Sequence, residues 1–289
     1  MNDKLLRAAD YGERENQAVF QVLVELAQIL GTQHENFVIV GGSVPSFLFK
    51  NAEPEHIGTL DIDLDLNPEA LADYDYAELI LELEKHGYER NVDDLKPFQL
   101  RRTIDLKDGT EPVPVIVDLL MPKDAVVREI EPKIIDGLNV QRIDGGIYAL
   151  KHYQEISIDG YMPDGRPNKV KILVASTSAL LVMKGYALVG RDKQKDAYDI
   201  WFCIRNYEGG IEALAEECRP LLEEEEARRA YESIAEKFRN ESDFGPVTVR
   251  RFLENSPEKC GDMTPEQIQT DAYVRVSKWC ELLGIKKEK

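Results

Sequence analysis

The chain has 289 residues, 43% of them hydrophobic, which is enough for one large core or two smaller ones. Acidic residues outnumber basic ones, 54 to 36, so the formal charge is −18. That excess opposes a broad nucleic-acid-binding surface, although it is compatible with a local basic groove. We expect no membrane span and no signal peptide, because no apolar run is long enough for either.

The cysteines and histidines argue against a zinc site or a disulfide framework. The four cysteines are widely separated, with no Cys-x-x-Cys pair, and the four histidines do not fall at metal-ligand spacing. Cysteines in such an arrangement are typical of a reducing compartment. We therefore expect a cytoplasmic protein.

The chain begins with a predicted helix and a predicted buried strand. Apolar residues recur at helical spacing within residues 1–30, and Gly31 is a suitable end for that helix. Residues 37–40 form a short apolar run typical of a buried strand. Three small residues follow it: Gly41, Gly42 and Ser43. Paired glycines let a backbone approach a ligand closely, and we expect Ser43 to cap a short helix over residues 44–50.

Residues 59–66 alternate strictly between polar and aliphatic side chains. This period predicts a half-buried strand with Asp61, Asp63 and Asp65 on one face. Aspartate is depleted in strands, so we interpret Asp61 and Asp63 as ligands of a divalent cation, Mg²⁺ or Mn²⁺. We expect Asp65 to be a solvated strand end. The alternative is an edge strand whose acidic residues only protect it from aggregation.

Two further strands are predicted after a helix that ends at Gly87. Residues 98–106 and 113–120 flank a turn at residues 107–110 and so form a hairpin. Asp118 lies in the apolar run of the second strand, where an acid without a function would be poorly placed. We therefore add Asp118 to the candidate site residues.

The second half of the chain is predicted to be mainly helical. Residues 123–175 are expected to form β structure that extends or flanks the sheet, and a helix follows them. Near the C-terminus, residues 264–267 (Thr-Pro-Glu-Gln) predict a capped helix start. We predict an α/β fold in which residues 1–175 form the core with its N-terminal helix and residues 176–289 form a helical domain.

A second group of charged residues lies on two predicted helices joined by a turn. Lys184 is on the first helix, Arg191 is in the turn, and the second helix carries Lys195, Asp196 and Asp199. Lys195 and Asp199 are four residues apart, the spacing of an ordinary surface ion pair. A charged helical hairpin without a function is therefore the alternative to a binding role.

The order of the motifs between residues 37 and 66 resembles the nucleotidyltransferase superfamily built on the polymerase-β-like core. There, an apolar strand, a Gly-Gly/Ser turn and a short helix precede Asp-x-Asp on the next strand. A third carboxylate lies on a later, neighbouring strand, and Asp118 matches it. The resemblance implies a mixed sheet flanked by helices, a helical C-terminal half, and Asp118 close to Asp61 and Asp63.

The pattern Lys…Arg…Lys-Asp-x-x-Asp-Ile over residues 176–204 is similar to the later motifs of AbiEii-type nucleotidyltransferases, toxins of abortive-infection and toxin–antitoxin systems. In many members a lysine directly precedes the two glycines, whereas Val40 stands there in this chain. Arg191 or Lys50 could supply that charge. The resemblance implies these nucleotide-binding residues: Gly41, Gly42, Ser43, Lys184, Arg191, Asp196 and Asp199.

The activity implied by the resemblance is transfer of a nucleoside monophosphate from a nucleoside triphosphate to an acceptor hydroxyl. Asp61, Asp63 and Asp118 would be the catalytic residues and would hold Mg²⁺ or Mn²⁺ in a two-metal mechanism. The acceptor is RNA or tRNA, a protein or a small molecule. An antitoxin protein is the expected partner.

Three alternatives remain open. An antibiotic-modifying or other small-molecule nucleotidyltransferase uses the same core, and the acidic charge favours such an acceptor over RNA. A nuclease or phosphodiesterase could use three carboxylates and two metals, but it would not need the Gly-Gly-Ser turn. A catalytically inert nucleotide-binding module fits the Val40 departure, although three intact aspartates argue against it.

Overall fold

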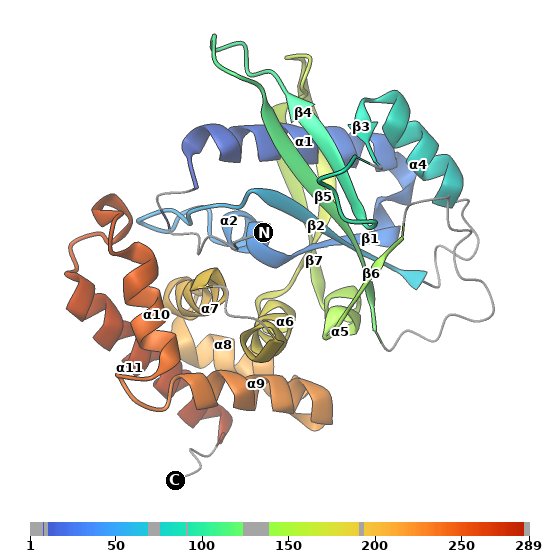
Figure 1. Ribbon diagram of the computed structural model, residues 1–289. Coiled ribbons are helices and arrows are strands. Elements are labelled where there is room, and N and C mark those ends of the chain that lie inside the picture. Colours follow the sequence, from blue (N-terminus) through green and yellow to red (C-terminus); the bar gives the residue numbers. More distant parts are fainter. Residues whose placement is uncertain are drawn as a thin grey trace. The chain divides into compact units, whose positions relative to one another are not determined.

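The computed structural model describes residues 8, 11–68, 76–90, 92–123, 139–190 and 194–285. The chain divides into two compact units. The α/β unit comprises Gly12–Val44 and Thr59–Ser176, and the helical unit comprises Met1–Tyr11, Pro45–Gly58 and Thr177–Lys289. The predicted α/β fold with a helical C-terminal half is confirmed (Figure 1).

The described part of the α/β unit is built on one mixed sheet of eight strands, in the order β3-β4-β5-β2-β1-β8-β7, with β6 pairing with β5. The central strand β2 is antiparallel to β1 and parallel to β5. It is therefore paired on both sides and is not an edge strand. The strands are β1 (Phe37–Val40), β2 (Asp61–Leu66), β3 (Tyr88–Glu89), β4 (Gln99–Ile104), β5 (Val113–Pro122), β6 (Gln141–Ile143), β7 (Tyr153–Tyr161) and β8 (Pro167–Ala175).

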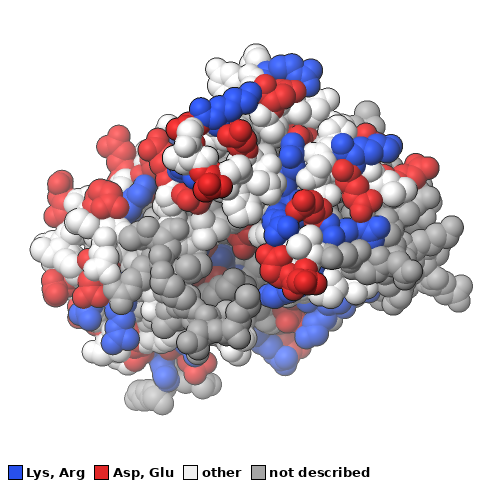
Figure 2. Space-filling model, turned by 45° about the horizontal axis from the view of Figure 1, so that its top comes forward, with Lys and Arg blue, Asp and Glu red and all other residues white. Residues whose placement is uncertain are grey.

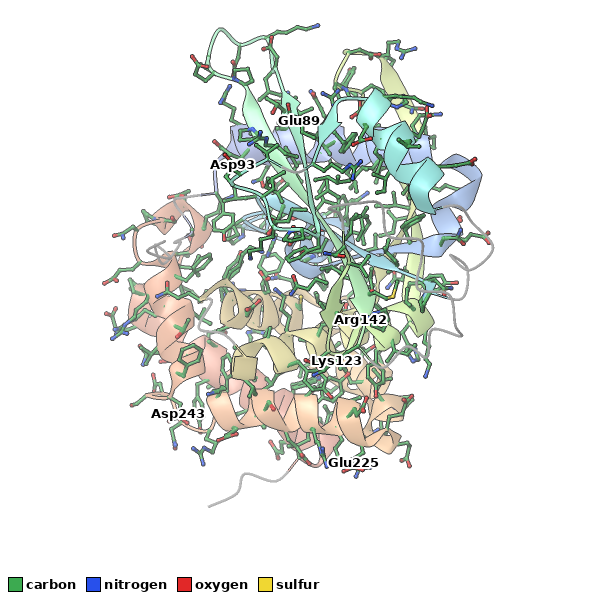
Figure 3. The ribbon with its side chains drawn as sticks, turned by 45° about the vertical axis from the view of Figure 1, so that its right-hand side comes forward. Glu89, Asp93, Lys123, Arg142, Glu225 and Asp243 are labelled. Atoms are coloured by element: carbon green, nitrogen blue, oxygen red, sulfur yellow. The ribbon has the colours of Figure 1, made fainter. Side chains whose placement is uncertain are left out.

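The helix α1 (Glu13–Leu30) packs against the sheet through its apolar face and contacts β5, β7 and β8 (Figure 1). It ends where Gly31 adopts a φ of 48°, as the sequence predicts. The other helices along the sheet segment are α4 (Tyr76–Lys85), α5 (Gly146–Lys151) and the 3-10 helices η2 (Gly31–Asn36) and η3 (Gly41–Ser43). The predicted hairpin is also confirmed, because β4 and β5 pair in antiparallel register. Figure 3 labels Lys123, the residue that follows β5, and Arg142, the middle residue of β6.

The helical unit has a core of aromatic and aliphatic side chains, with Tyr231 and Trp279 in edge-to-face contact. Its last helix begins with the predicted capping box between Thr264 and Gln267. Gly185 lets two helices approach closely, since a Cβ there would lie 2.2 Å from the carbonyl oxygen of Ala230. The helices are α2 (Val44–Leu48, which begins one residue before this unit), α6 (Thr177–Gly190), α7 (Gln194–Asn206), α8 (Gly210–Cys218), η4 (Arg219–Glu223), α9 (Glu225–Lys237), α10 (Phe244–Leu253), η5 (Pro257–Lys259) and α11 (Pro265–Leu283).

Charged side chains of both signs lie on the surface, as the composition of the chain predicts (Figure 2). Lys and Arg side chains are interspersed among Asp and Glu over the face shown in Figure 2, so the acidic excess is not gathered into one patch there. None of the helices in the described part of the chain combines the length and the apolar character needed to span a bilayer.

Candidate active site

Three carboxylates meet on one face of the sheet. Asp61 and Asp63 come from β2, Asp118 comes from β5, and Asp63 and Asp118 are directly paired in the parallel register of these strands. One oxygen from each of the three carboxylates lies within 4.8 Å of the other two. All three side chains are partly exposed. The closeness of Asp118 to Asp61 and Asp63, which the family resemblance implies, is confirmed.

Neutral donors hold two of these carboxylates. The Thr59 hydroxyl donates a hydrogen bond to Oδ1 of Asp61 at 2.6 Å. The Thr59 backbone N–H in turn donates to Oδ1 of Asn16 on α1, at 3.1 Å. The Gln99 side-chain amide donates to Oδ1 of Asp118 at 2.8 Å. These contacts orient the carboxylates without cancelling their charge.

The first glycine of the Gly-Gly-Ser turn is required by the cluster itself. Gly41 has a φ of 71°, and a Cβ on it would lie only 1.9 Å from Oδ2 of Asp63. The two residues meet because Val40, just before Gly41, is the register partner of Asp63. The expectation that Ser43 caps the next helix is wrong, because its hydroxyl donates back to the carbonyl of Val40 at 3.4 Å.

The cluster fits a divalent cation. Its three carboxylates offer hard oxygen ligands from two adjacent strands, within the mutual distance at which they can share an ion. The missing Cβ at Gly41 leaves room beside Asp63. Asp61, Asp63 and Asp118 are therefore the described residues that would hold Mg²⁺ or Mn²⁺.

Asp65 does not behave as the solvated strand end that we expected. It is fully buried, and neither carboxylate oxygen has a hydrogen-bond partner among the described residues. The cause is its position between β1 and β5 and against Gly146, where an added Cβ would be 2.7 Å from Oδ2 of Asp65. Burial raises the pKa of Asp65 to about 8, so the carboxyl is mostly protonated at neutral pH.

The second group of predicted residues meets inside the helical unit. The Lys184 ammonium lies 2.7 Å from a carboxylate oxygen of Asp196 and 2.7 Å from one of Asp199. Lys195 also pairs with Asp199, at 3.1 Å. The interpretation of Lys195 and Asp199 as a surface ion pair is wrong, because Asp199 is completely buried and Lys184 and Asp196 are 5% and 1% exposed. Arg191 lies outside the described residues.

His56 is also part of this buried network, although no sequence pattern pointed to it. The Gly58 N–H donates to Nδ1 of His56 at 3.1 Å, so the ring carries its proton on Nε2 and donates to Oδ1 of Asp199 at 3.0 Å. The Ser46 hydroxyl lies 3.2 Å from the same Nδ1. Burial lowers the pKa of His56 to about 4, and the ring is therefore neutral.

Asp199 is the centre of the network. Its burial alone would raise its pKa, but Lys184, then Lys195 and His56 outweigh burial and hold the pKa below its ordinary value. The carboxylate is thus ionised and surrounded by donors. Two lysines and two aspartates balance each other in charge around a neutral histidine.

Two of the residues that orient the acidic cluster could have been found from the sequence. A hairpin centred on the turn at Asp108 and Gly109 already places Gln99 opposite Asp118, as the observed register does. Thr59 shares the polar face of the alternating strand with Asp61. The role of His56 had no such signal, because its partner Asp199 lies 143 residues away in the chain.

Comparison with known protein families shows to which family the chain belongs. The family profile of the nucleotidyl transferase AbiEii toxin, type IV TA system, matches residues 29–259. The chain belongs to the AbiEii family. The match spans both the acidic cluster and the buried Lys184 network, in agreement with the resemblance seen in the sequence.

Two solved structures from Helicobacter pylori are similar to this chain. One, described as a candidate nucleotidyltransferase, has 13% identity and a TM-score of 0.45, covering 94% of this chain and 99% of its own. The other, JHP933, has 12% identity and a TM-score of 0.44, covering 93% and 94%. A search of curated proteins finds none that matches.

Proposed function

We propose that this AbiEii-family protein is a metal-dependent nucleotidyltransferase. It transfers a nucleoside monophosphate from a nucleoside triphosphate to an acceptor hydroxyl. The observation that carries the proposal is the meeting of Asp61, Asp63 and Asp118 within 4.8 Å on adjacent strands, next to a glycine that leaves room for Asp63. Membership of the nucleotidyl transferase AbiEii toxin family supports it.

The three carboxylates act as a binding site for two divalent cations in this proposal. Asp61 and Asp63 would hold the cation that accompanies the triphosphate, and together with Asp118 they would hold the second. Bound there, Mg²⁺ or Mn²⁺ would neutralise phosphate charge and lower the pKa of the acceptor hydroxyl.

The transfer breaks one phosphoanhydride bond of the triphosphate and forms one phosphoester bond to the acceptor. The acceptor oxygen forms a bond to the α-phosphorus, the bond from that phosphorus to the bridging oxygen of the β-phosphate breaks, and pyrophosphate leaves. The acceptor loses its proton to solvent. Carboxylates that are fixed before the reaction suit this chemistry, since catalysis of phosphoryl transfer is mainly positioning and electrostatic stabilisation.

We assign nucleotide contacts to two sets of residues. Backbone N–H groups of the Gly-Gly-Ser turn can bind phosphate oxygens, since that turn leads into a helix. In the helical unit the assignment rests on the family motif. Lys184 already pairs with two aspartates there, so any contact with phosphate has to compete with them. The assigned residues are Gly41, Gly42, Ser43, Lys184, Arg191, Asp196 and Asp199.

The biological setting follows the family. We propose that the protein is the toxin of a toxin–antitoxin or abortive-infection system, with an antitoxin protein as its partner. All four cysteines are free thiols, which fits action in the reducing cytoplasm. The acceptor classes are RNA or tRNA, protein and small molecules, and the experiment below separates them.

Label transfer tests the proposal. The protein is incubated with Mg²⁺ and each α-labelled nucleoside triphosphate in turn, together with fractions of cellular RNA, protein and small molecules. We expect label to join one fraction with stoichiometric release of pyrophosphate. Asp118→Asn is expected to reduce the rate by roughly a thousandfold, because it removes several kcal/mol of transition-state stabilisation.

Two outcomes would contradict the proposal. One is cleavage of RNA without label transfer, which is the behaviour of a nuclease. The other is triphosphate binding without transfer to any fraction under conditions where Asp118→Asn behaves like the wild type, which is the behaviour of an inert binding module.

A further inference from the structure

Gln99 stands directly beside the acidic cluster. It is the first residue of β4 and the register partner of Asp118 on β5, while Asp118 is in turn the partner of Asp63 on β2. Register partners on neighbouring strands present their side chains on the same face of a sheet. Asp63, Asp118 and Gln99 therefore lie side by side on three neighbouring strands, on the same face of the sheet.

The orientation of the Gln99 amide is determined by two hydrogen bonds. Its Oε1 accepts from the backbone N–H of Lys96 at 3.0 Å, and its Nε2 donates to Oδ1 of Asp118 at 2.8 Å. A flipped amide would place an NH₂ group against an N–H and an oxygen against a carboxylate, so only one orientation satisfies both partners.

The segment that supplies the Lys96 N–H is itself ordered. The Gln99 N–H donates to the Lys96 carbonyl at 2.9 Å, which closes a β-turn with Pro97 at its second position. The next ladder bond, from Leu119 N–H to the Phe98 carbonyl at 3.0 Å, ties this turn to β5. Gln99 is therefore fixed both by the backbone hydrogen bond of the turn and by the two hydrogen bonds of its side-chain amide.

A neutral donor suits a carboxylate that has to bind a cation. An amide N–H stabilises the ionised carboxylate, yet it carries no net charge that would compete with a metal. The basic residue nearest along β4 is engaged elsewhere, since Arg101 pairs with Glu89 and Asp94 at the β3 side of the sheet, where Figure 3 labels Glu89.

We infer that Gln99 is a positioning residue for Asp118. By donating to Oδ1 it fixes the orientation of the Asp118 carboxylate, which would then hold a cation in a defined geometry. This inference rests on the proposed function of the cluster. Gln99 acts only through Asp118 and does not touch the substrate.

The test replaces the amide by a side chain of similar length that cannot donate. Gln99→Met is compared with Gln154→Met, the same change at an exposed position on β7 of the same sheet. Mn²⁺ affinity is measured by calorimetry, and kcat and KM by label transfer. We expect Gln99→Met to weaken Mn²⁺ binding or lower kcat by about 10- to 100-fold, as for other residues that orient metal ligands, with KM for the triphosphate within about twofold.

A double-mutant cycle shows whether the effect passes through Asp118. In the Asp118→Asn background, Gln99→Met is expected to change the Mn²⁺ dissociation constant by less than about twofold, because there is no carboxylate left to orient. A purely structural role for Gln99 would instead give the same effect in both backgrounds. Thermal unfolding of each variant confirms that the fold is retained.

The outcomes separate this inference from the proposed function. If Asp118→Asn alters Mn²⁺ binding but Gln99→Met behaves like Gln154→Met in every measurement, the inference is wrong and the proposed function stands. If Asp118→Asn leaves Mn²⁺ binding and activity unchanged, the proposed function is wrong, and the inference falls with it.

Discussion

The molecule contains two groups of aspartates whose surroundings are opposite. Asp61, Asp63 and Asp118 are partly exposed on a sheet, where the Thr59 hydroxyl donates to Asp61 and the Gln99 amide donates to Asp118. Asp196 and Asp199 are buried among helices and paired with lysine ammonium groups. The first group keeps its charge accessible, and the second neutralises its charge internally.

The comparison shows that aspartate serves two different purposes in this molecule. Three carboxylates that converge on one face repel each other, and a bound cation would relieve that repulsion. Buried carboxylates with two lysines and a histidine are already satisfied, and removing one partner leaves an uncompensated buried charge. The first group therefore has the features of a binding site, and the second has those of an internal support of the fold.

The largest effect on stability is expected at Lys184. Lys184→Ala leaves Asp196 and Asp199 buried without their shared cation, so we expect a loss of about 3–5 kcal/mol in the free energy of unfolding. Divalent-cation affinity should stay within about twofold of wild type. The matched control is Lys171→Ala, an exposed lysine paired with Glu155, which should cost less than about 1 kcal/mol. Equal costs for the two variants, measured by denaturant unfolding, would contradict the buried network.

A smaller, pH-dependent effect is expected at Asp65. The folded state raises its pKa from 3.8 to about 8 and so binds the proton more tightly than the unfolded chain does. The stability it contributes is complete below the unfolded pKa and is lost as pH rises toward about 8. Asp65→Asn removes this dependence, so the variant should gain about 2–3 kcal/mol on the wild type between pH 5 and pH 7.

Unfolding in the presence of a chelator measures this difference without a contribution from bound cations. Asp159→Asn, at an exposed aspartate on β7, is the control and should show no pH-dependent gain. A constant difference between Asp65→Asn and wild type across this pH range would show that Asp65 is ionised in the folded protein.

The smallest effect on stability is expected at Gly41. Gly41→Ala places a side chain in a left-handed conformation and against Asp63, and should cost about 1–2 kcal/mol while weakening Mn²⁺ binding. Gly109→Ala is the control, because Gly109 has a similar φ of 81° and open space around it. Gly109→Ala should therefore lose only the stability that the strained backbone conformation costs, with no change in Mn²⁺ affinity. If Gly41→Ala left the Mn²⁺ affinity unchanged, the claim that the cation site needs a glycine at this position would be wrong.

The sequence predicted the parts of the site that depend on local periodicity and on hairpin register. The alternation of residues 59–66 correctly placed Asp61 and Asp63 on one face, and the turn at residues 107–110 correctly paired the two strands of the hairpin. The parallel pairing of β2 with β5, which brings Asp118 beside Asp63, joins strands far apart in the chain, and only the resemblance to the nucleotidyltransferase core implied it.

Burial could not be predicted in the same way. Asp65 continues the alternation of Asp61 and Asp63, yet it is covered because Gly146, far along the chain, packs against it. Lys184 and Asp199 have the spacing of surface residues on a helical hairpin, but the wider fold closes around them. A charged residue becomes a buried one only through partners that local patterns do not reveal.

The most direct test of the account is the response of the melting temperature to Mn²⁺. At a concentration of 100 times the dissociation constant, wild-type protein should gain about 2.7 kcal/mol, which corresponds to several degrees. The Asp61→Asn, Asp63→Asn double variant should show no such gain, while Lys171→Ala should respond as the wild type does. An equal Mn²⁺ shift in the double variant would contradict the central claim that these aspartates form the cation site.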